Sequence, residues 1–297
     1  MIILRHVGDV RQKSYDLCDC RLMTAGDVSV LCVVGEVRGV TQLHDVVYIL
    51  RSSTILRFNL TTRQRLTNIV VSGLRYAWDI VACERTSQLY VAELQFCPHP
   101  PWTTLATIWR VSSEGADTKR WLPKSPSDTF KPWSLSVTST RLLVTSSYPQ
   151  LIQFDALGDE LRRVQLPDDM APRHAVESPT GTFIISHDNY QLRQDQVSEV
   201  NTAGEVLRQF SRSRLSSLGV TAHVAADSHG NILVADQHNR RILLLDAQLR
   251  LRRVVVDADQ LNYKEPRCLC YKEQSGQLLV GLVGSDTETV EVFNVVC

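Results

Sequence analysis

Short runs of apolar, strand-forming residues alternate with polar turn residues along almost the whole chain. The clearest unit extends from His223 to Val256 and reads as four strands separated by three turns. Two of these turns carry the pairs Gly230-Asn231 and His238-Asn239, which are residue types that favour tight connections between strands. No helical heptad and no alternation of strands with helices competes with this pattern, so the sequence predicts an all-β fold.

Weaker copies of the four-strand unit recur along the chain. Their first strands are marked by one residue each: Val40, Trp78, Trp133, His174, His223 and Cys268. Successive markers lie 38 to 55 residues apart, which suits four-stranded propeller blades with insertions in the longer units. The repeat therefore predicts a six-bladed β-propeller.

The two ends of the chain together supply one blade. The last unit has three strands before Cys297, and a lone strand, Ser29 to Val34, precedes the first unit. Pairing of this lone strand with the last unit would close the ring and remove two exposed sheet edges. We therefore expect the propeller to span residues 27–297, with residues 1–26 as a linker or a truncated upstream segment.

Composition and charge narrow the classes of partner. Lys+Arg and Asp+Glu both number 32, and 43% of the residues are hydrophobic, enough for a substantial core. The balanced charge argues against the broad basic surface with which proteins neutralise nucleic-acid phosphates. No apolar run approaches the ~20 residues of a membrane-spanning helix. We expect a cytoplasmic protein without membrane contact, unless a signal peptide has been removed.

Two of the cysteine pairs are spaced as C-x-C: Cys18/Cys20 and Cys268/Cys270. This is not the C-x-x-C spacing of common zinc sites. Alternate residues of a strand share one face, so Cys268 and Cys270 are expected to be reduced thiols of the core. A disulfide from Cys20 to Cys297, tying the chain ends together, is the alternative left open.

One unit resembles the NHL repeat in specific residues: Asp227, Gly230, Asp236, Asn239 and Arg241. The other five units resemble that repeat only in strand spacing and scattered residues. Proteins with NHL repeats form six-bladed propellers, which in TRIM-type members follow RING, B-box and coiled-coil segments and recruit protein or RNA. The resemblance implies a structural role for the five residues, chiefly in fixing turns of the blade. Because this sequence has no RING, B-box or coiled coil, the ligase activity is not carried over.

We expect a non-catalytic interaction scaffold that binds a protein or peptide through one propeller face. The turns of that face carry aromatic and basic residues: Tyr76, Trp102, Lys131, Tyr148, Tyr190, Arg240 and Tyr263. Trp102 ends a proline-stiffened loop, which presents an aromatic side chain at low entropic cost. The same side chains would stack the bases of single-stranded RNA, so an RNA binder is the first alternative. The oligomeric state is left open.

A metal-dependent enzyme of the lactonase, esterase or lyase type is the second alternative, because six-bladed propellers also carry such enzymes. A zinc site with an open position would use three histidines that converge on the channel: His44, His174 and His223. A calcium site would use carboxylates near the first strands: Asp79, Glu177 and Asp227.

Motifs of catalysis are missing from the sequence: it has no Gly-x-Ser-x-Gly elbow, phosphate-binding loop or His-Glu-x-x-His helix. The positions of the histidines and carboxylates also follow the repeat, which gives them a structural explanation. We therefore expect no cofactor, no bound metal and no enzymatic activity.

Overall fold

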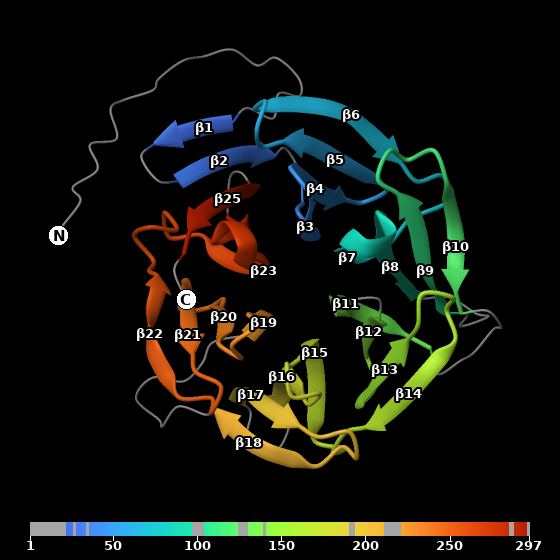
Figure 1. The fold of residues 1–297 in the computed structure, drawn as a ribbon, viewed down its shortest axis with the longest axis vertical. Helices are drawn as coiled ribbons and strands as arrows, with labels where there is room; N and C mark the ends of the chain where they lie inside the picture. The colour runs from blue at the N-terminus through green and yellow to red at the C-terminus, as the bar shows by residue number, and fades with distance from the viewer. Residues whose placement is uncertain are drawn as a thin grey trace.

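A computed structural model of the chain shows six β-sheets arranged as a ring around a central channel (Figure 1). The structure describes residues 22–25, 28–33, 36–96, 104–123, 130–138, 141–189, 194–210, 221–284 and 288–295. Within these ranges the secondary structure is almost entirely β, with two short 3-10 helices, η1 (Glu84–Thr86) and η2 (Glu273–Ser275). The predicted six-bladed propeller is confirmed.

The first three blades are four-stranded antiparallel sheets. Blade 1 contains β3 (Gly39–Leu43), β4 (Val46–Arg51), β5 (Thr54–Asn59) and β6 (Gln64–Val70). Blade 2 contains β7 (Ala77–Cys83), β8 (Gln88–Phe96), β9 (Thr104–Ser112) and β10 (Thr118–Leu122). Blade 3 contains β11 (Pro132–Thr138), β12 (Arg141–Ser146), β13 (Gln150–Phe154) and β14 (Glu160–Gln165).

The next two blades repeat this plan, and the sixth combines both ends of the chain. Blade 4 contains β15 (Met170–Glu177), β16 (Phe183–Asn189), β17 (Gln194–Val200) and β18 (Val206–Phe210). Blade 5 contains β19 (Thr221–Ala226), β20 (Ile232–Asp236), β21 (Arg241–Leu245) and β22 (Leu251–Val256). Blade 6 contains β23 (Glu265–Lys272), β24 (Gln277–Val283), β25 (Glu288–Asn294), β2 (Val28–Val33) and β1 (Leu22–Ala25).

The ring is closed by the N-terminal strand, as the sequence predicted. Strand β2 pairs antiparallel with β25, with Val28 opposite Phe293 and Val33 opposite Glu288. Strand β1 then pairs with β2 and gives this blade a fifth strand. Residues 22–25 thus pair in a blade, although we expected residues 1–26 to be a linker or a truncated upstream segment. Residues 1–21 lie outside the described part.

Burial falls from the middle of each blade to its outer edge. All five residues of β20 are buried, whereas the outermost strand β14 is exposed except at Val164. The middle strands are covered on both faces by the neighbouring blades, so they have near-continuous apolar sequences. The core therefore consists of six apolar layers between blades, and the inner strands are left to line the channel (Figure 1).

In the described part of the chain, Cys268 and Cys270 are free thiols. Burial raises the pKa of Cys268 to about 12 and also raises the pKa of Cys270. The bridge left open between Cys20 and Cys297 falls outside the described residues. In the described part of the chain, no helix has the length and apolar character needed to cross a membrane.

Candidate functional site

The inner strands begin at the same face of the propeller, which we call the mouth face. Five of them carry a β-bulge close to this end. In four of these blades the extra residue has no partner opposite it: Trp78, Trp133, Arg173 and Arg267. In blade 5 the bulge lies between Thr221 and Val224 and contains His223. A bulge re-aims a side chain out of the regular pleat, and here it directs one residue per blade toward the channel.

These bulge residues surround a cavity of about 270 Å³ at the channel mouth, the mouth pocket. Arg38, which directly precedes β3, supplies the contribution of blade 1. We call the six residues the mouth ring: Arg38, Trp78, Trp133, Arg173, His223 and Arg267. Deeper positions of the pocket are lined by Asp79, Ser134 and Cys268, and its side by Gln237.

The mouth ring has an aromatic half and a basic half. Trp78 and Trp133 come from adjacent blades and stack with ring centroids 4.4 Å apart. The guanidinium of Arg38 lies over the Trp78 ring at 5.2 Å, a cation–π contact. The basic half consists of Arg173, His223 and Arg267, which follow one another in blades 4, 5 and 6, and of Arg38, where it meets the aromatic half.

Carboxylates hold the arginines of the mouth ring in place. Glu36 takes two of them, because its Oε1 accepts from Arg267 Nη1 at 2.8 Å and its Oε2 pairs with Arg38 Nη2 at 2.6 Å. Asp188 accepts from Arg173 Nε at 3.0 Å. These pairs fix the planes of the guanidinium groups, so the basic half is preorganised.

Below the mouth ring, two side chains tie neighbouring blades together. Asp79 Oδ2 accepts from the backbone N–H of Leu135 in blade 3 at 2.8 Å. His174 Nε2 bonds to the Leu135 carbonyl at 3.2 Å, and its Nδ1 accepts from the backbone N–H of Val224 at 3.4 Å. Because a carbonyl only accepts and a backbone N–H only donates, these bonds fix His174 as the neutral Nε2–H tautomer. Burial and the neighbouring His223 lower the pKa of His174 well below its usual value.

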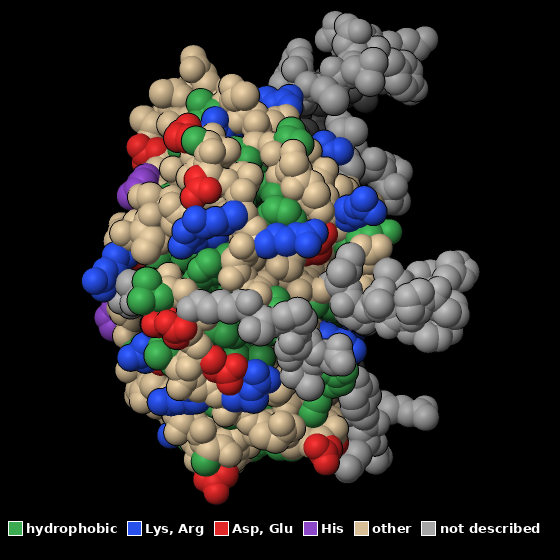
Figure 2. Space-filling view, turned by 90° about the vertical axis from the view of Figure 1, so that its right-hand side faces the viewer, with side chains coloured by type: hydrophobic (Ala, Val, Ile, Leu, Met, Phe, Trp, Pro, Cys, Tyr) green, Lys and Arg blue, Asp and Glu red, His purple; other side chains and the backbone are tan. Residues whose placement is uncertain are grey.

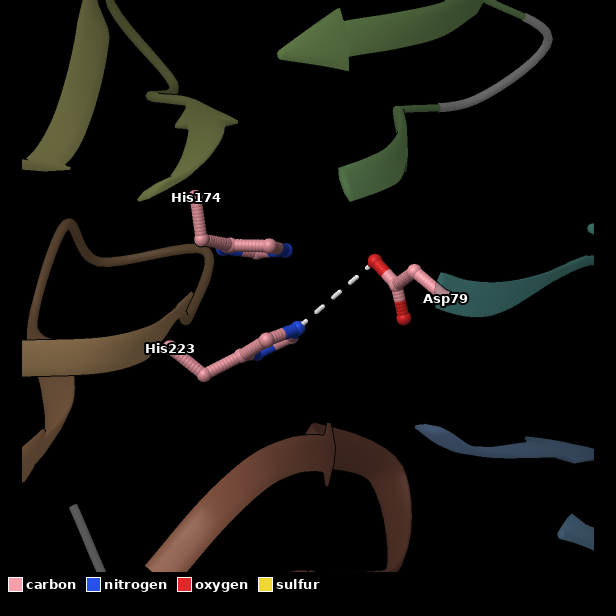
Figure 3. A group of neighbouring side chains, drawn as sticks. All are labelled: Asp79, His174 and His223. Carbon is pink, nitrogen blue, oxygen red and sulfur yellow. Dashed lines mark ion pairs between the residues drawn. The ribbon is translucent and has the colours of Figure 1, made fainter. Parts of the chain in front are cut away.

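His223 is the exception among these polar groups. Its ring stacks on that of His174, with centroids 3.4 Å apart, and both rings turn an edge toward Asp79 (Figure 3). Both ring nitrogens are buried and have no hydrogen-bond partner among the described residues. Asp79 Oδ2 lies 3.9 Å from Nε2. Ser134 Oγ, in the same pocket, also lacks a partner within the described part of the chain.

The residues present fit a metal ion poorly. Donor atoms of Asp79, His174 and His223 lie within 4.8 Å of one another. However, the donors of Asp79 and His174 already bond to backbone groups that join blades, and only His223 has nitrogens left unused by the described residues. A three-ligand metal would have to replace those bonds.

The structure does not bring the predicted zinc and calcium ligands together as sets. His44 is exposed in the β3–β4 turn, at the end of the inner strand opposite the mouth face. Glu177 and Asp227 lie at that same far end of their inner strands, whereas Asp79 lies near the mouth.

The predicted binding residues in the described part lie around the mouth pocket rather than in it. Tyr76, Tyr148 and Tyr263 are exposed. They lie in connections that lead into inner strands or join second to third strands, which are the connections of the mouth face. Arg240 is exposed in another such turn, and Lys131 Nζ donates to Tyr148 Oη at 2.7 Å. Trp102 and Tyr190 lie outside the described residues.

The mouth ring was found only in part by sequence reasoning. Trp78, Trp133 and His223 served as repeat markers, but His174 and Cys268 are each one residue past the bulge position. The residues equivalent to Trp133 are Arg173 and Arg267, which were missed. A signal was available, since three bulge residues directly follow prolines: Pro132, Pro172 and Pro266. Proline lacks an N–H and is tolerated in edge strands and at bulges.

The residues that resemble the NHL motif form two turns of blade 5. Asp227 Oδ1 accepts from the backbone N–H groups of His229 and Asn231, and Gly230 adopts a φ of 83°. Asp236 accepts from Asn239 Nδ2 at 2.8 Å and from Arg241 Nε at 2.6 Å. These bonds fix the connections between first and second strands and between second and third strands.

Comparisons with known proteins identify the fold and no family. No family model and no curated protein sequence matches this chain. The resemblance to the NHL repeat therefore remains a resemblance of one unit.

Solved structures that share the fold include enzymes and a WD40 domain. Virginiamycin B lyase from Staphylococcus aureus matches with a TM-score of 0.61 and 11% identity, over 91% of this chain and 99% of the lyase. A glucose dehydrogenase matches with a TM-score of 0.63 and 10% identity, over 90% and 99%. The WD40 β-propeller domain of Doa1 matches with a TM-score of 0.61 and 13% identity, over 92% and 95%.

This set of similar structures corrects one expectation. The sequence led us to expect a protein without enzymatic activity, but the same fold carries a lyase and a dehydrogenase. The fold is therefore no ground for excluding catalysis. At these levels of identity, the comparisons establish that the chain is a β-propeller and leave its function to be argued from the mouth face.

Proposed function

We propose that the chain recognises a protein or peptide partner at the mouth face and inserts part of that partner into the mouth pocket. The observation that carries this proposal is the mouth ring itself. Each of the six blades contributes at least one side chain to a single pocket, and in five of them a bulge residue is among the contributions. Tyrosine, tryptophan and arginine are the residue types that dominate binding energy at protein interfaces.

The surroundings of the pocket support a partner larger than the pocket. Exposed tyrosines from three blades, Tyr76, Tyr148 and Tyr263, lie on the same face. Such a rim suits a segment that lies across the face and places one side chain or one chain end at the centre.

Selection of random peptides on the purified chain tests this function. We expect selected peptides to lose affinity about 5- to 30-fold when Tyr76 or Tyr263 is replaced by serine, because loss of a contact hot spot costs about 1–2 kcal/mol. Leu157→Ser is the matched control, since Leu157 is exposed in the β13–β14 turn on the opposite face. The proposal fails when no peptide is selected, or when the tyrosine variants bind like the Leu157 variant.

The RNA alternative has less support from the described residues. It requires a contiguous basic face, but the three arginines of the mouth ring are each paired with a carboxylate. On the side of the ring along which β10 lies, basic and acidic side chains are interspersed (Figure 2).

A second candidate function is an enzyme that acts on a small molecule in the mouth pocket, with His223 as the group that accepts or donates a proton. The observation in its favour is an imidazole whose two nitrogens are buried and unused by the described residues, next to a carboxylate, in the lining of a cavity. Among propellers of similar fold, a Staphylococcus aureus virginiamycin B lyase with one histidine changed to alanine is catalytically inactive.

Activity screening tests this second candidate. Lactones and aryl esters are suitable substrates, because their hydrolysis releases an acid or a coloured phenol that can be followed directly. We expect His223→Asn to abolish turnover and His229→Asn, which changes an exposed histidine outside the channel, to leave it unchanged. Turnover that survives His223→Asn would remove His223 as the acid–base group.

A further inference from the structure

The mouth pocket offers an excess of hydrogen-bond donors on its basic half. Guanidinium groups only donate, and Arg38 and Arg267 each carry five N–H groups, more than their bonds to Glu36 use. Two carboxylates close to Arg38 and Arg267 are already engaged. Asp79 accepts from the backbone N–H groups of Ile80 and Leu135, and Glu36 accepts from two arginines.

The polar atoms without partners among the described residues point to the same kind of ligand. His223 can donate from one ring nitrogen, and Ser134 Oγ can donate as well. Such buried atoms destabilise the fold when they are left unpaired, so a ligand that bonds to them recovers that energy. A ligand rich in acceptor atoms therefore complements this half of the pocket.

Charge alone does not attract such a ligand strongly. The three arginines of the mouth ring face the carboxylates of Glu36 and Asp188, and Asp79 lies below them. These carboxylates balance the arginines, so affinity must come from donors that are held in fixed directions. The carboxylate pairs provide this orientation, as they do at sites that grip carboxylates with paired N–H groups.

The aromatic half of the mouth ring selects the part of the ligand that lies next to its acceptor atoms. The stacked Trp78–Trp133 pair is half-buried and forms an aromatic wall on the side of blades 2 and 3. A flat or apolar group fits against this wall. The two halves together describe a ligand with a carboxylate at one end and an aromatic or apolar group beside it.

We propose that the mouth pocket is a carboxylate-binding subsite, in which Arg173, His223 and Arg267 take the carboxylate and the Trp78–Trp133 wall takes an adjacent aromatic or apolar group. The inference rests on the proposed function, because the molecule that bears the carboxylate is then a peptide. Two peptide sources supply this chemistry: a C-terminal carboxylate, or an acidic side chain next to an aromatic residue.

Small probes test the subsite without the natural partner. N-acetyl-phenylalanine has the carboxylate and the ring, its amide lacks the charge, and N-acetyl-aspartyl-phenylalaninamide moves the carboxylate to a side chain. Binding is followed by the fluorescence of the protein's own tryptophans. We expect the acid to bind at least about ten-fold tighter than the amide, because charge-assisted hydrogen bonds are stronger than neutral ones.

Variants assign that preference to the pocket. We expect Arg267→Gln and His223→Asn each to reduce the preference for acid over amide to less than about three-fold. Arg162→Gln is the control, since it removes an exposed arginine of the outermost strand β14 that does not line the pocket. Unchanged thermal melting shows that each variant is folded. Equal binding of acid and amide to the unmodified protein, or a preference that survives both pocket variants, would overturn the proposal.

The outcomes also separate this inference from the proposed function. A preference for N-acetyl-phenylalanine indicates a C-terminal carboxylate, and a preference for the aspartyl compound indicates an acidic side chain. Binding of the acid when no peptide can be selected retains the subsite and refutes peptide recognition. Selected peptides with no preference for a carboxylate retain peptide recognition and refute the subsite.

Discussion

His174 and His223 stack on each other, but only His174 joins neighbouring blades through hydrogen bonds. Replacing each histidine by phenylalanine tests whether the two residues differ in their contribution to stability. Phenylalanine keeps an aromatic ring in place and removes both nitrogens. In His174 these nitrogens bond to the Leu135 carbonyl and the Val224 N–H, and both partners are buried backbone groups. In His223 neither nitrogen has a partner among the described residues.

The expected energies follow from these bonds. Each buried group left without a partner costs about 1–3 kcal/mol. Because the Val224 bond is long, we expect His174→Phe to lower the free energy of unfolding by about 2–4 kcal/mol. His223→Phe removes two polar atoms and breaks no hydrogen bond to a described residue, so we expect a change within about 0.5 kcal/mol or a small gain in stability.

Urea denaturation measures the difference. Far-ultraviolet circular dichroism and tryptophan fluorescence should give coincident transitions, which justifies conversion of the midpoint and slope into a free energy. We expect the two variants to differ by about 2 kcal/mol or more. Equal losses in both, or a larger loss in His223→Phe, would refute the division of roles between these residues.

Two further predictions concern pH and closure of the ring. Because burial keeps the pKa of His174 below its unfolded value of 6.5, the neutral form stabilises the fold above pH 6.5, and we expect about 1 kcal/mol of this stability to be lost between pH 6.5 and 5.5. Burial also lowers the pKa of His187, which therefore contributes in the same direction. His174→Phe should thus reduce the pH dependence of the urea midpoint without abolishing it. An unchanged pH dependence would contradict the role given to His174. A chain that begins at residue 36 lacks β1 and β2 and exposes the edge of β25, so we expect a lower melting temperature and aggregation. A chain that begins at residue 22 is the control, and identical melting of the two would show that β2 does not close the ring.

The sequence alone determined the architecture because that information is local and repeated. Strand-forming runs, the turn residues around Gly230 and Asn239, and the recurrence of the unit every 38 to 55 residues each reflect one blade, and six copies reinforce one another. Even the closure followed from counting strands at the two ends, since a lone strand and a three-strand unit complete one sheet.

The site was decided by the tertiary structure, because it depends on differences of a single residue between blades. A bulge shifts the side chain that faces the channel by one position, and the repeat spacing does not resolve such a shift. His174 and His223 therefore seemed equivalent in the sequence, yet one bonds blades together and the other lies in the mouth ring with Arg173 and Arg267. Only the closed ring brings six residues from distant parts of the chain around one pocket, which is why its chemistry is visible in the fold and not along the sequence.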